Sequence, residues 1–182
     1  AEHKIPLSEL ARDPSIWTFF EEQGQDDPSF SQYFSHALDQ VREGSQYPYA
    51  VFDKRSQQFA GMTRLYQYSP ESLNIKVGHT WYGATFRGTG LNKHSKYLLF
   101  QFLFDHLGLQ RIGLAAHQEN IVSLSAMKSV GCREEGRLRS FFRSIDGKGY
   151  ADCVLFSILQ SEWQQSVQTM LSQKLDISAT AR

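Results

Sequence analysis

The stretch Arg87-Gly88-Thr89-Gly90-Leu91-Asn92, called here the glycine loop, constrains this chain more than any other segment. It lies between a strand-like run, residues 75–82, and an amphipathic helical pattern, residues 91–107. A glycine-rich turn that opens a helix presents unpaired backbone N–H groups at the positive end of the helix dipole. Glycines let the backbone approach an anion closely, and the arginine adds a positive charge. The segment is therefore a candidate cradle for a phosphate or pyrophosphate.

Three glycine patterns compete for this loop. The dinucleotide fingerprint G-x-G-x-x-G fails because Lys93 stands where the third glycine is needed. The ATP-type loop G-x-x-x-x-G-K-[ST] occurs nowhere in the chain. The pattern R-x-x-G-x-G/A fits with one departure, since Asn92 takes the place of a Gly or Ala. From these six residues alone, an ordinary strand-to-helix connection with turn glycines stays open as well.

Composition narrows the class of protein. A chain of 182 residues fits one domain with a substantial core. Lys plus Arg and Asp plus Glu both number 19, so nothing favours a nucleic-acid partner, which normally needs a basic face. The two cysteines, Cys132 and Cys153, are expected to be buried thiols in a reducing cytoplasm. No metal-ligand spacing is present, and the apolar runs are too short to cross a membrane.

The order of patterns predicts a mixed α/β fold. Asp13-Pro14 and Asp27-Pro28 are typical helix starts, and a helical apolar stripe follows each of them. Strands are expected at residues 47–52, 59–66, 74–82, 111–116, 135–143 and 150–159, and helices at residues 91–107, 121–130 and from Ser161 onward. We expect one domain over residues 1–173, a polar tail over residues 174–182, and a first strand that is missing before Ala1.

The second half of the chain resembles the GNAT acetyltransferases, in particular their RimJ/RimL-like branch. Type members of that branch acetylate the N-termini of ribosomal proteins. The resemblance covers about residues 47–163. It rests on four pieces in register: Gly78-His79-Thr80-Trp81, the glycine loop, Leu107-Gly108-Leu109-Gln110-Arg111-Ile112, and Asn120-x-x-Ser123 followed by residues 129–138. A final Ser161-Glu162-Trp163 also fits.

The resemblance implies a bacterial-type GNAT fold, α/β (α+β), with a central, mixed, mostly antiparallel and splayed sheet flanked by helices. It also implies acetyl-CoA as cofactor, with the pyrophosphate on the glycine loop and the pantetheine arm near Asn120. Backbone groups of Trp81, Tyr82 and Gly83 are expected to pair with that arm and to polarise the thioester. The residues expected to bind the cofactor are Trp81, Tyr82, Gly83, Arg87, Gly88, Thr89, Gly90, Leu91, Asn92, Asn120 and Ser123.

Acid and base candidates follow from the same resemblance. Ser123 is the candidate that protonates the departing thiolate, although a solvent-facing helix serine is an alternative. Many relatives carry a carboxylate in the strand before the loop, but here Lys76-Val77-Gly78 replaces the E-x-G pattern. His79 then becomes the candidate base, directly or through water. A histidine that only packs within a strand is the alternative, and amine transfer without a dedicated base also stays open.

The expected function is acetyl-CoA-dependent transfer of an acetyl group to a primary amine, directly within a ternary complex. The acceptor is expected to be a protein N-terminus or a small amine. The alternatives are a non-catalytic CoA-binding module, for regulation or partner binding, and a structural domain that binds no cofactor. We expect a cytoplasmic protein that forms a homodimer and needs neither a metal, a nucleic acid nor a membrane.

Overall fold

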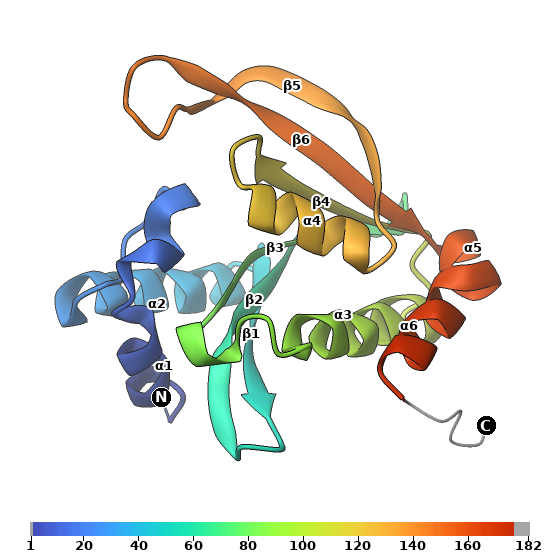
Figure 1. Ribbon diagram of the computed structural model, residues 1–182, viewed down its shortest axis with the longest axis horizontal. Coiled ribbons are helices and arrows are strands. Elements are labelled where there is room, and N and C mark those ends of the chain that lie inside the picture. Colours follow the sequence, from blue (N-terminus) through green and yellow to red (C-terminus); the bar gives the residue numbers. More distant parts are fainter. Residues whose placement is uncertain (1, 177–182) are drawn as a thin grey trace. The chain divides into compact units, whose positions relative to one another are not determined.

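The computed structural model describes residues 2–176, whose helices and strands are labelled in Figure 1. The sheet has six strands in the order β1-β2-β3-β4-β6-β5. The β1–β2, β4–β6 and β5–β6 pairs are antiparallel, whereas β3–β4 is parallel. The expected mixed, mostly antiparallel α/β architecture is therefore confirmed. Within it the chain forms two compact units, which are Ala1–Tyr68 with Val77–Gly88 and Ser69–Lys76 with Thr89–Arg182.

The first unit holds the N-terminal helices and one edge of the sheet. Its elements are α1 (Lys4–Ala11), the 3-10 turn η1 (Pro14–Phe19), α2 (Asp27–Arg42), β1 (Gln46–Asp53), most of β2 (Gln58–Ser69), the last part of β3 (Asn74–Tyr82) and η2 (Ala84–Phe86). Asp13 caps η1 by accepting a hydrogen bond from the backbone N–H of Ser15, at 2.9 Å. The cap of α2 is Asp26 rather than Asp27, because Ser29 at the third helical position completes a capping box with it.

Aromatic side chains form the core of the first unit. Trp17 lies 5.0 Å from the ring of Tyr33 and 6.1 Å from that of Trp81, measured between centroids. Gly61 lets β2 approach β3 closely, since a Cβ added there would lie only 2.0 Å from the Trp81 carbonyl oxygen. Ile5 of α1 lies outside this core, since it is 72% exposed. The packing around Trp17 fixes η1 and the end of β3 in one rigid cluster.

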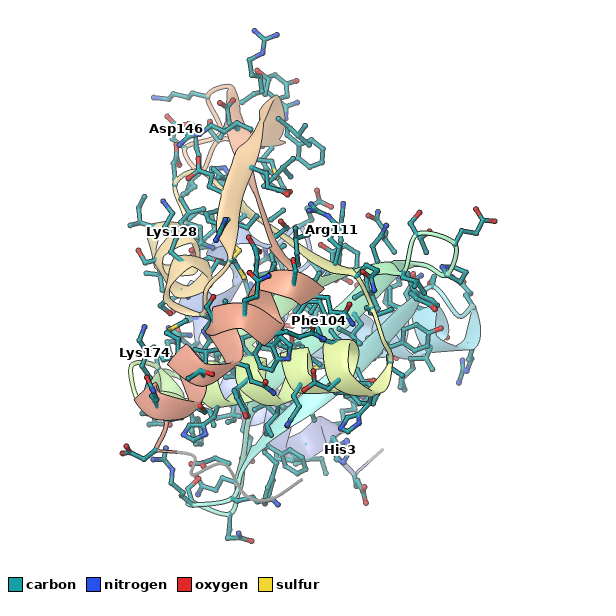
Figure 2. The ribbon with its side chains drawn as sticks, turned by 90° about the vertical axis from the view of Figure 1, so that its right-hand side faces the viewer. His3, Phe104, Arg111, Lys128, Asp146 and Lys174 are labelled. Carbon is teal, nitrogen blue, oxygen red and sulfur yellow. The ribbon has the colours of Figure 1, made fainter. Side chains whose placement is uncertain are left out.

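The second unit carries the rest of the sheet and the later helices. Its elements are α3 (Leu91–Gln101) with the π-helical turn η3 (Phe102–His106), β4 (Arg111–His117), α4 (Ile121–Ser129), β5 (Arg133–Arg143), β6 (Tyr150–Leu159), and α5 (Gln160–Glu162) continuing through η4 (Trp163–Val167) into α6 (Gln168–Lys174). The long β5–β6 hairpin turns near Asp146, which lies at its tip in Figure 2. The parallel ladder joins residues 74–76 of β3 to residues 111–113 of β4, although both strands continue further.

Trp163 is the centre of the second unit's core. Its ring stacks on Phe104, which Figure 2 labels, and contacts Phe100 edge-on. The stripe predicted for residues 91–107 is partly wrong, because Leu98 and Leu107 are 62% and 51% exposed. The π-helical turn at residues 102–106 has more residues per turn than an α-helix. A uniform 3.6-residue period over residues 91–107 therefore does not predict which side chains are buried.

The boundaries of most elements agree with the sequence expectations. The buried strand after Gln110, the hairpin around residues 146–147 and the helix that follows Asn120 are all confirmed. The last helix is regular through Lys174, so the tail begins later than expected. The tail predicted over residues 174–182 otherwise falls on residues 177–182, which lie outside the described residues.

Candidate functional site

The candidate residues divide between the two units. In the first unit, His79 lies within β3 and has a backbone φ of 48°, in the left-handed region that non-glycine residues rarely adopt. Its ring lies 5.5 Å from that of Tyr66, edge-on, and 6.2 Å from that of Phe20. Gly78 makes room for this arrangement, because a Cβ there would meet the Tyr66 ring at 2.9 Å. Such strained positions concentrate at functional sites.

Charged groups of the first unit surround this histidine. Arg64 of β2 is fully buried, with its guanidinium carbon 4.4 Å from the centroid of the Tyr33 ring. Its Nη1 donates to Gln46 Oε1 at 3.3 Å, and its Nη2 lies 3.6 Å from Glu22 Oε2. The other carboxylate oxygen of Glu22 lies 2.7 Å from His36 Nδ1. Glu22 therefore links a buried cation to a half-exposed imidazole.

These surroundings weaken His79 as a base. Burial, and then the positive charge of Arg64, lower the pKa of His79 from 6.5 to about 4, although Glu22 acts in the opposite direction. The imidazole is therefore neutral at neutral pH and can accept a hydrogen bond. A general base works best with a pKa near the operating pH, so a pKa of about 4 favours orienting an amine or a water over holding a proton. Its catalytic role stays a prediction.

The end of β3 is engaged with its own unit. The indole N–H of Trp81 donates to the Tyr33 hydroxyl at 3.2 Å. The backbone N–H of Gly83 donates to the Ala60 carbonyl at 2.9 Å, and the Tyr82 carbonyl accepts from Arg87 Nε at 2.9 Å. The Gly83 N–H and the Tyr82 carbonyl therefore already have partners in this structure. That Trp81, Tyr82 and Gly83 bind the cofactor stays a prediction.

All three guanidinium nitrogens of Arg87 have partners in the first unit. Besides the Tyr82 carbonyl, Nη1 donates to Ser15 Oγ at 2.9 Å and Nη2 lies 3.0 Å from Asp13 Oδ2. Hydrogen bonds from Ser15, together with the Arg87 charge, lower the pKa of Asp13 below its usual value. Asp13 is therefore ionised at neutral pH, and the arginine expected to face a phosphate is held against η1.

The glycine loop itself has the geometry of an anion cradle. Gly88 and Gly90 adopt positive φ values of 74° and 88°, and a Cβ added to either would meet nothing within 4 Å. The protein therefore leaves open space beside both residues. Gly90 is the N-cap of α3, with no side chain capping the helix, and Thr89 Oγ1 accepts from the Leu91 N–H at 3.4 Å. Backbone N–H groups, a helix dipole and free space together fit a pyrophosphate group.

Asn120 and Ser123 meet at the start of α4 in the second unit. The side-chain oxygen of Asn120 accepts a hydrogen bond from the Ser123 N–H at 3.0 Å, so the expected cap is confirmed. This contact uses only the oxygen of Asn120 and leaves its NH₂ group for other partners. Within residues 2–176 the Ser123 hydroxyl has no hydrogen-bond partner and is half-buried. Both side chains can therefore donate to a bound cofactor, a role that stays a prediction.

Sequence reasoning missed the partners of Arg87 and of His79. Ser15 and Arg87 are 72 residues apart, and no local spacing connects them. Asp13 was expected only as a helix cap, yet it both caps η1 and pairs with the guanidinium of Arg87. Glu22 and Arg64 gave no motif at all, because their proximity depends on how η1 and β2 pack.

Metal sites and membrane-spanning helices are two further features that residues 2–176 do not contain. Over residues 2–176, no group of three or more His, Cys, Asp or Glu side chains is placed to hold a metal ion. In the same residues, no helix has both the length and the apolarity that a membrane span requires.

Comparison with known proteins identifies the family. The family described as Acetyltransferase (GNAT) domain matches residues 1–133. A curated relative from Bacillus subtilis (strain 168), named "Putative ribosomal N-acetyltransferase YdaF", is 27% identical over 104 residues, which are 57% of this chain and 55% of YdaF. The chain thus spans about half the length of that relative.

Solved structures agree with this match. A GCN5-related N-acetyltransferase from Brucella melitensis superimposes with a TM-score of 0.84 at 24% identity, over 94% of this chain and 77% of that one. Mycobacterium smegmatis RimJ in complex with CoA-disulfide gives a TM-score of 0.77 at 21% identity, over 95% and 85%. The resemblance to the GNAT acetyltransferases is confirmed, and with it acetyl-CoA as the cofactor of the family. The chain belongs to the GNAT acetyltransferase family.

Proposed function

We propose that this protein is an acetyl-CoA-dependent N-acetyltransferase that moves the acetyl group to a primary amine by direct transfer within a ternary complex. The observation that carries the proposal is the glycine loop at the start of α3, in a chain that matches the family over residues 1–133. Two left-handed glycines with open space beside them fit the approach of a pyrophosphate.

The cofactor is proposed to bind along the glycine loop and the start of α4. Backbone N–H groups of residues 88–92 hold the pyrophosphate, where the dipole of α3 favours negative charge. The NH₂ group of Asn120 donates to a pantetheine amide carbonyl while its oxygen continues to cap α4. Asn92, in place of the usual Gly or Ala, contributes its backbone N–H, which is independent of the side chain.

Acetyl-CoA supplies the acetyl group as a thioester. The amine nitrogen forms a bond to the thioester carbonyl carbon, and the carbon–sulfur bond breaks. Ser123 donates its hydroxyl proton to the departing thiolate and regains a proton from water. His79, neutral at neutral pH, accepts a hydrogen bond from the amine or from an intervening water, and the excess proton leaves through water. Lys76, which is exposed on β3, stands where the E-x-G pattern has its carboxylate, so this chain has no carboxylate at that position.

The distribution of charge supports a cationic acceptor. Residues 1–45 contain nine acidic and three basic side chains, against ten and sixteen in residues 46–182. An acidic N-terminal segment raises the local concentration of amines, which are protonated in solution, and the basic remainder suits a cofactor with phosphate groups. We propose a protein N-terminus as the acceptor, by analogy with the name of the YdaF relative, or otherwise a small amine.

An acceptor screen by mass spectrometry tests the proposal. Full-length protein is incubated with acetyl-CoA and a panel of peptides with free N-termini, polyamines, amino acids and aminoglycosides. An acetylated product that depends on both protein and acetyl-CoA supports the proposal. CoA binding in a thermal-shift assay without any product would favour a non-catalytic CoA-binding module. No thermal shift would favour a structural domain, since a ligand at 100 times its dissociation constant should stabilise by about 2.7 kcal/mol.

Two further proposals concern the state of the protein in the cell. We place it in the cytoplasm, where the buried, unpaired thiols Cys132 and Cys153 stay reduced. We also propose a homodimer, because near-zero net charge permits association. Light scattering at micromolar concentration tests the second proposal, and a monomer mass would contradict it.

A further inference from the structure

We propose that Arg87 is a positioning residue that anchors the glycine loop to η1, and that it supports cofactor binding through this anchor rather than by contact with the pyrophosphate. The inference rests on the proposed function, because it concerns how the same loop is held. It goes beyond that function by assigning roles to Asp13 and Ser15, which lie far from the loop in sequence.

The geometry is that of a guanidinium with three separate partners. Nε donates to the Tyr82 carbonyl and Nη1 to Ser15 Oγ, both at 2.9 Å, while Nη2 pairs with Asp13 Oδ2 at 3.0 Å. A phosphate contact by Arg87 would compete with an ionised carboxylate that is already in place. Because Asp13 neutralises the guanidinium, Arg87 adds little net charge to the loop.

The partners of Arg87 are themselves held firmly. Asp13 caps η1, and that turn carries Trp17, which is 2% exposed and packed against Tyr33. On the other side, Tyr82 ends β3, and the adjacent Gly83 is hydrogen-bonded to Ala60. Arg87 therefore ties the start of the glycine loop to η1 and to the end of β3, immediately before the two left-handed glycines. Fixing the start of a flexible glycine segment reduces the ordering that cofactor binding requires.

The anchor also connects the loop with the surroundings of His79. The turn η1 runs from the Asp13 cap to Phe19, and the next residue, Phe20, has its ring 6.2 Å from the imidazole of His79. A change in the position of η1 would therefore alter both the start of the loop and one wall around the candidate base.

A double-mutant cycle measured by calorimetric titration of the full chain with CoA tests the inference. The variants are Asp13→Asn, Arg87→Gln, their combination, and Arg87→Lys. Asp13→Asn keeps an oxygen that can cap η1 but removes the negative charge. Asp26→Asn is the matched control, because Asp26 caps α2 in the same way and has no arginine partner in the described structure. Ser15→Ala is a second variant that leaves the cap oxygen intact.

If Arg87 acts by positioning, Asp13→Asn and Arg87→Gln should each weaken CoA binding about three- to tenfold, or about 0.7–1.4 kcal/mol. The combined variant should be no weaker than either single variant, because both remove the same anchor. Arg87→Lys should lose as much CoA affinity as Arg87→Gln, since an ammonium group cannot contact Tyr82, Ser15 and Asp13 together as the guanidinium does. Ser15→Ala should show a smaller loss, and Asp26→Asn should match the wild type.

Opposite results identify a phosphate contact instead. Asp13→Asn would then leave CoA affinity unchanged or tighten it, because it frees Arg87, and Arg87→Lys would retain most of the wild-type affinity. Either result overturns the inference. A loss of affinity that merely follows the unfolding temperature across all variants, Asp26→Asn included, overturns it too. A wild-type protein that binds no CoA would refute the proposed function itself, and the inference with it.

Discussion

The low pKa of His79 makes a quantitative prediction about stability. The imidazole has a pKa of about 4 in the folded protein against 6.5 ordinarily, mainly because burial disfavours its charged form. Between these values the unfolded chain binds the proton more readily than the folded protein does. The contribution of His79 to the free energy of unfolding is therefore fully present above pH 6.5 and is lost as the pH falls toward 4.

The size of the effect follows from the two pKa values. Between pH 7 and pH 5, His79 alone should lower the free energy of unfolding by about 2 kcal/mol, with one pKa unit worth about 1.4 kcal/mol. For a chain of this size that corresponds to about 4–8 °C in the unfolding temperature. His79→Asn should remove this part of the pH dependence. Asparagine is the suitable replacement because it tolerates the positive φ of 48°.

Urea unfolding at a series of pH values is the assay, with His106→Asn as an exposed-histidine control. The wild type and the control should lose stability in parallel as the pH falls from 7 to 5, and His79→Asn should lose about 2 kcal/mol less. If His79→Asn follows the wild type over this range, the imidazole titrates normally in the folded protein. The reasoning from burial and from the Arg64 charge would then be wrong.

Three other substitutions test the loop, the acid and the fold. Gly90→Val should abolish measurable CoA binding in calorimetry, whereas Gly147→Val, at a hairpin glycine with a similar φ of 72° and similarly open space, should leave it intact. Ser123→Ala should lower turnover by roughly 10²-fold or more with acetyl-CoA affinity unchanged, and equal turnover would remove it as the acid. Gly61→Ala should destabilise the protein by about 1–3 kcal/mol in urea unfolding, because its Cβ would meet the Trp81 carbonyl, while Gly136→Ala, with nothing within 4 Å, should not.

Local signals in the sequence were enough to predict most of the fold. Helix caps such as Asp13 and Asn120 and the turn at Asp146-Gly147 depend on residues close in sequence, and the structure has them where expected. The predicted stripe on residues 91–107 was partly wrong because the chain there passes from an α-helix into a π-helical turn. The 3.6-residue periodicity of an α-helix does not indicate such a change of phase.

In the candidate site, too, the sequence predicted the local features but not those that depend on residues distant in sequence. The glycine loop and Asn120 were identified from spacing, because the cradle and the cap are local arrangements. The partners of Arg87 and the charges around His79 come from segments distant in sequence, so only the fold brings them together. That a cofactor binds at the glycine loop and Asn120 stays a prediction of the sequence, whereas the partners that hold Arg87 and the charges near His79 are seen only in the fold.

One measurement tests the central claim most directly. Purified protein is mixed with acetyl-CoA and a peptide with a free N-terminus, and free thiol and acetylated peptide are quantified together over time. We expect both products to appear at equal rates, in a one-to-one ratio, and only when protein, acetyl-CoA and an unblocked amine are all present. A peptide with a blocked N-terminus and no other amine is the control. Thiol release without acetylated amine, or no release with any amine of the panel, would contradict N-acetyl transfer as the function of this chain.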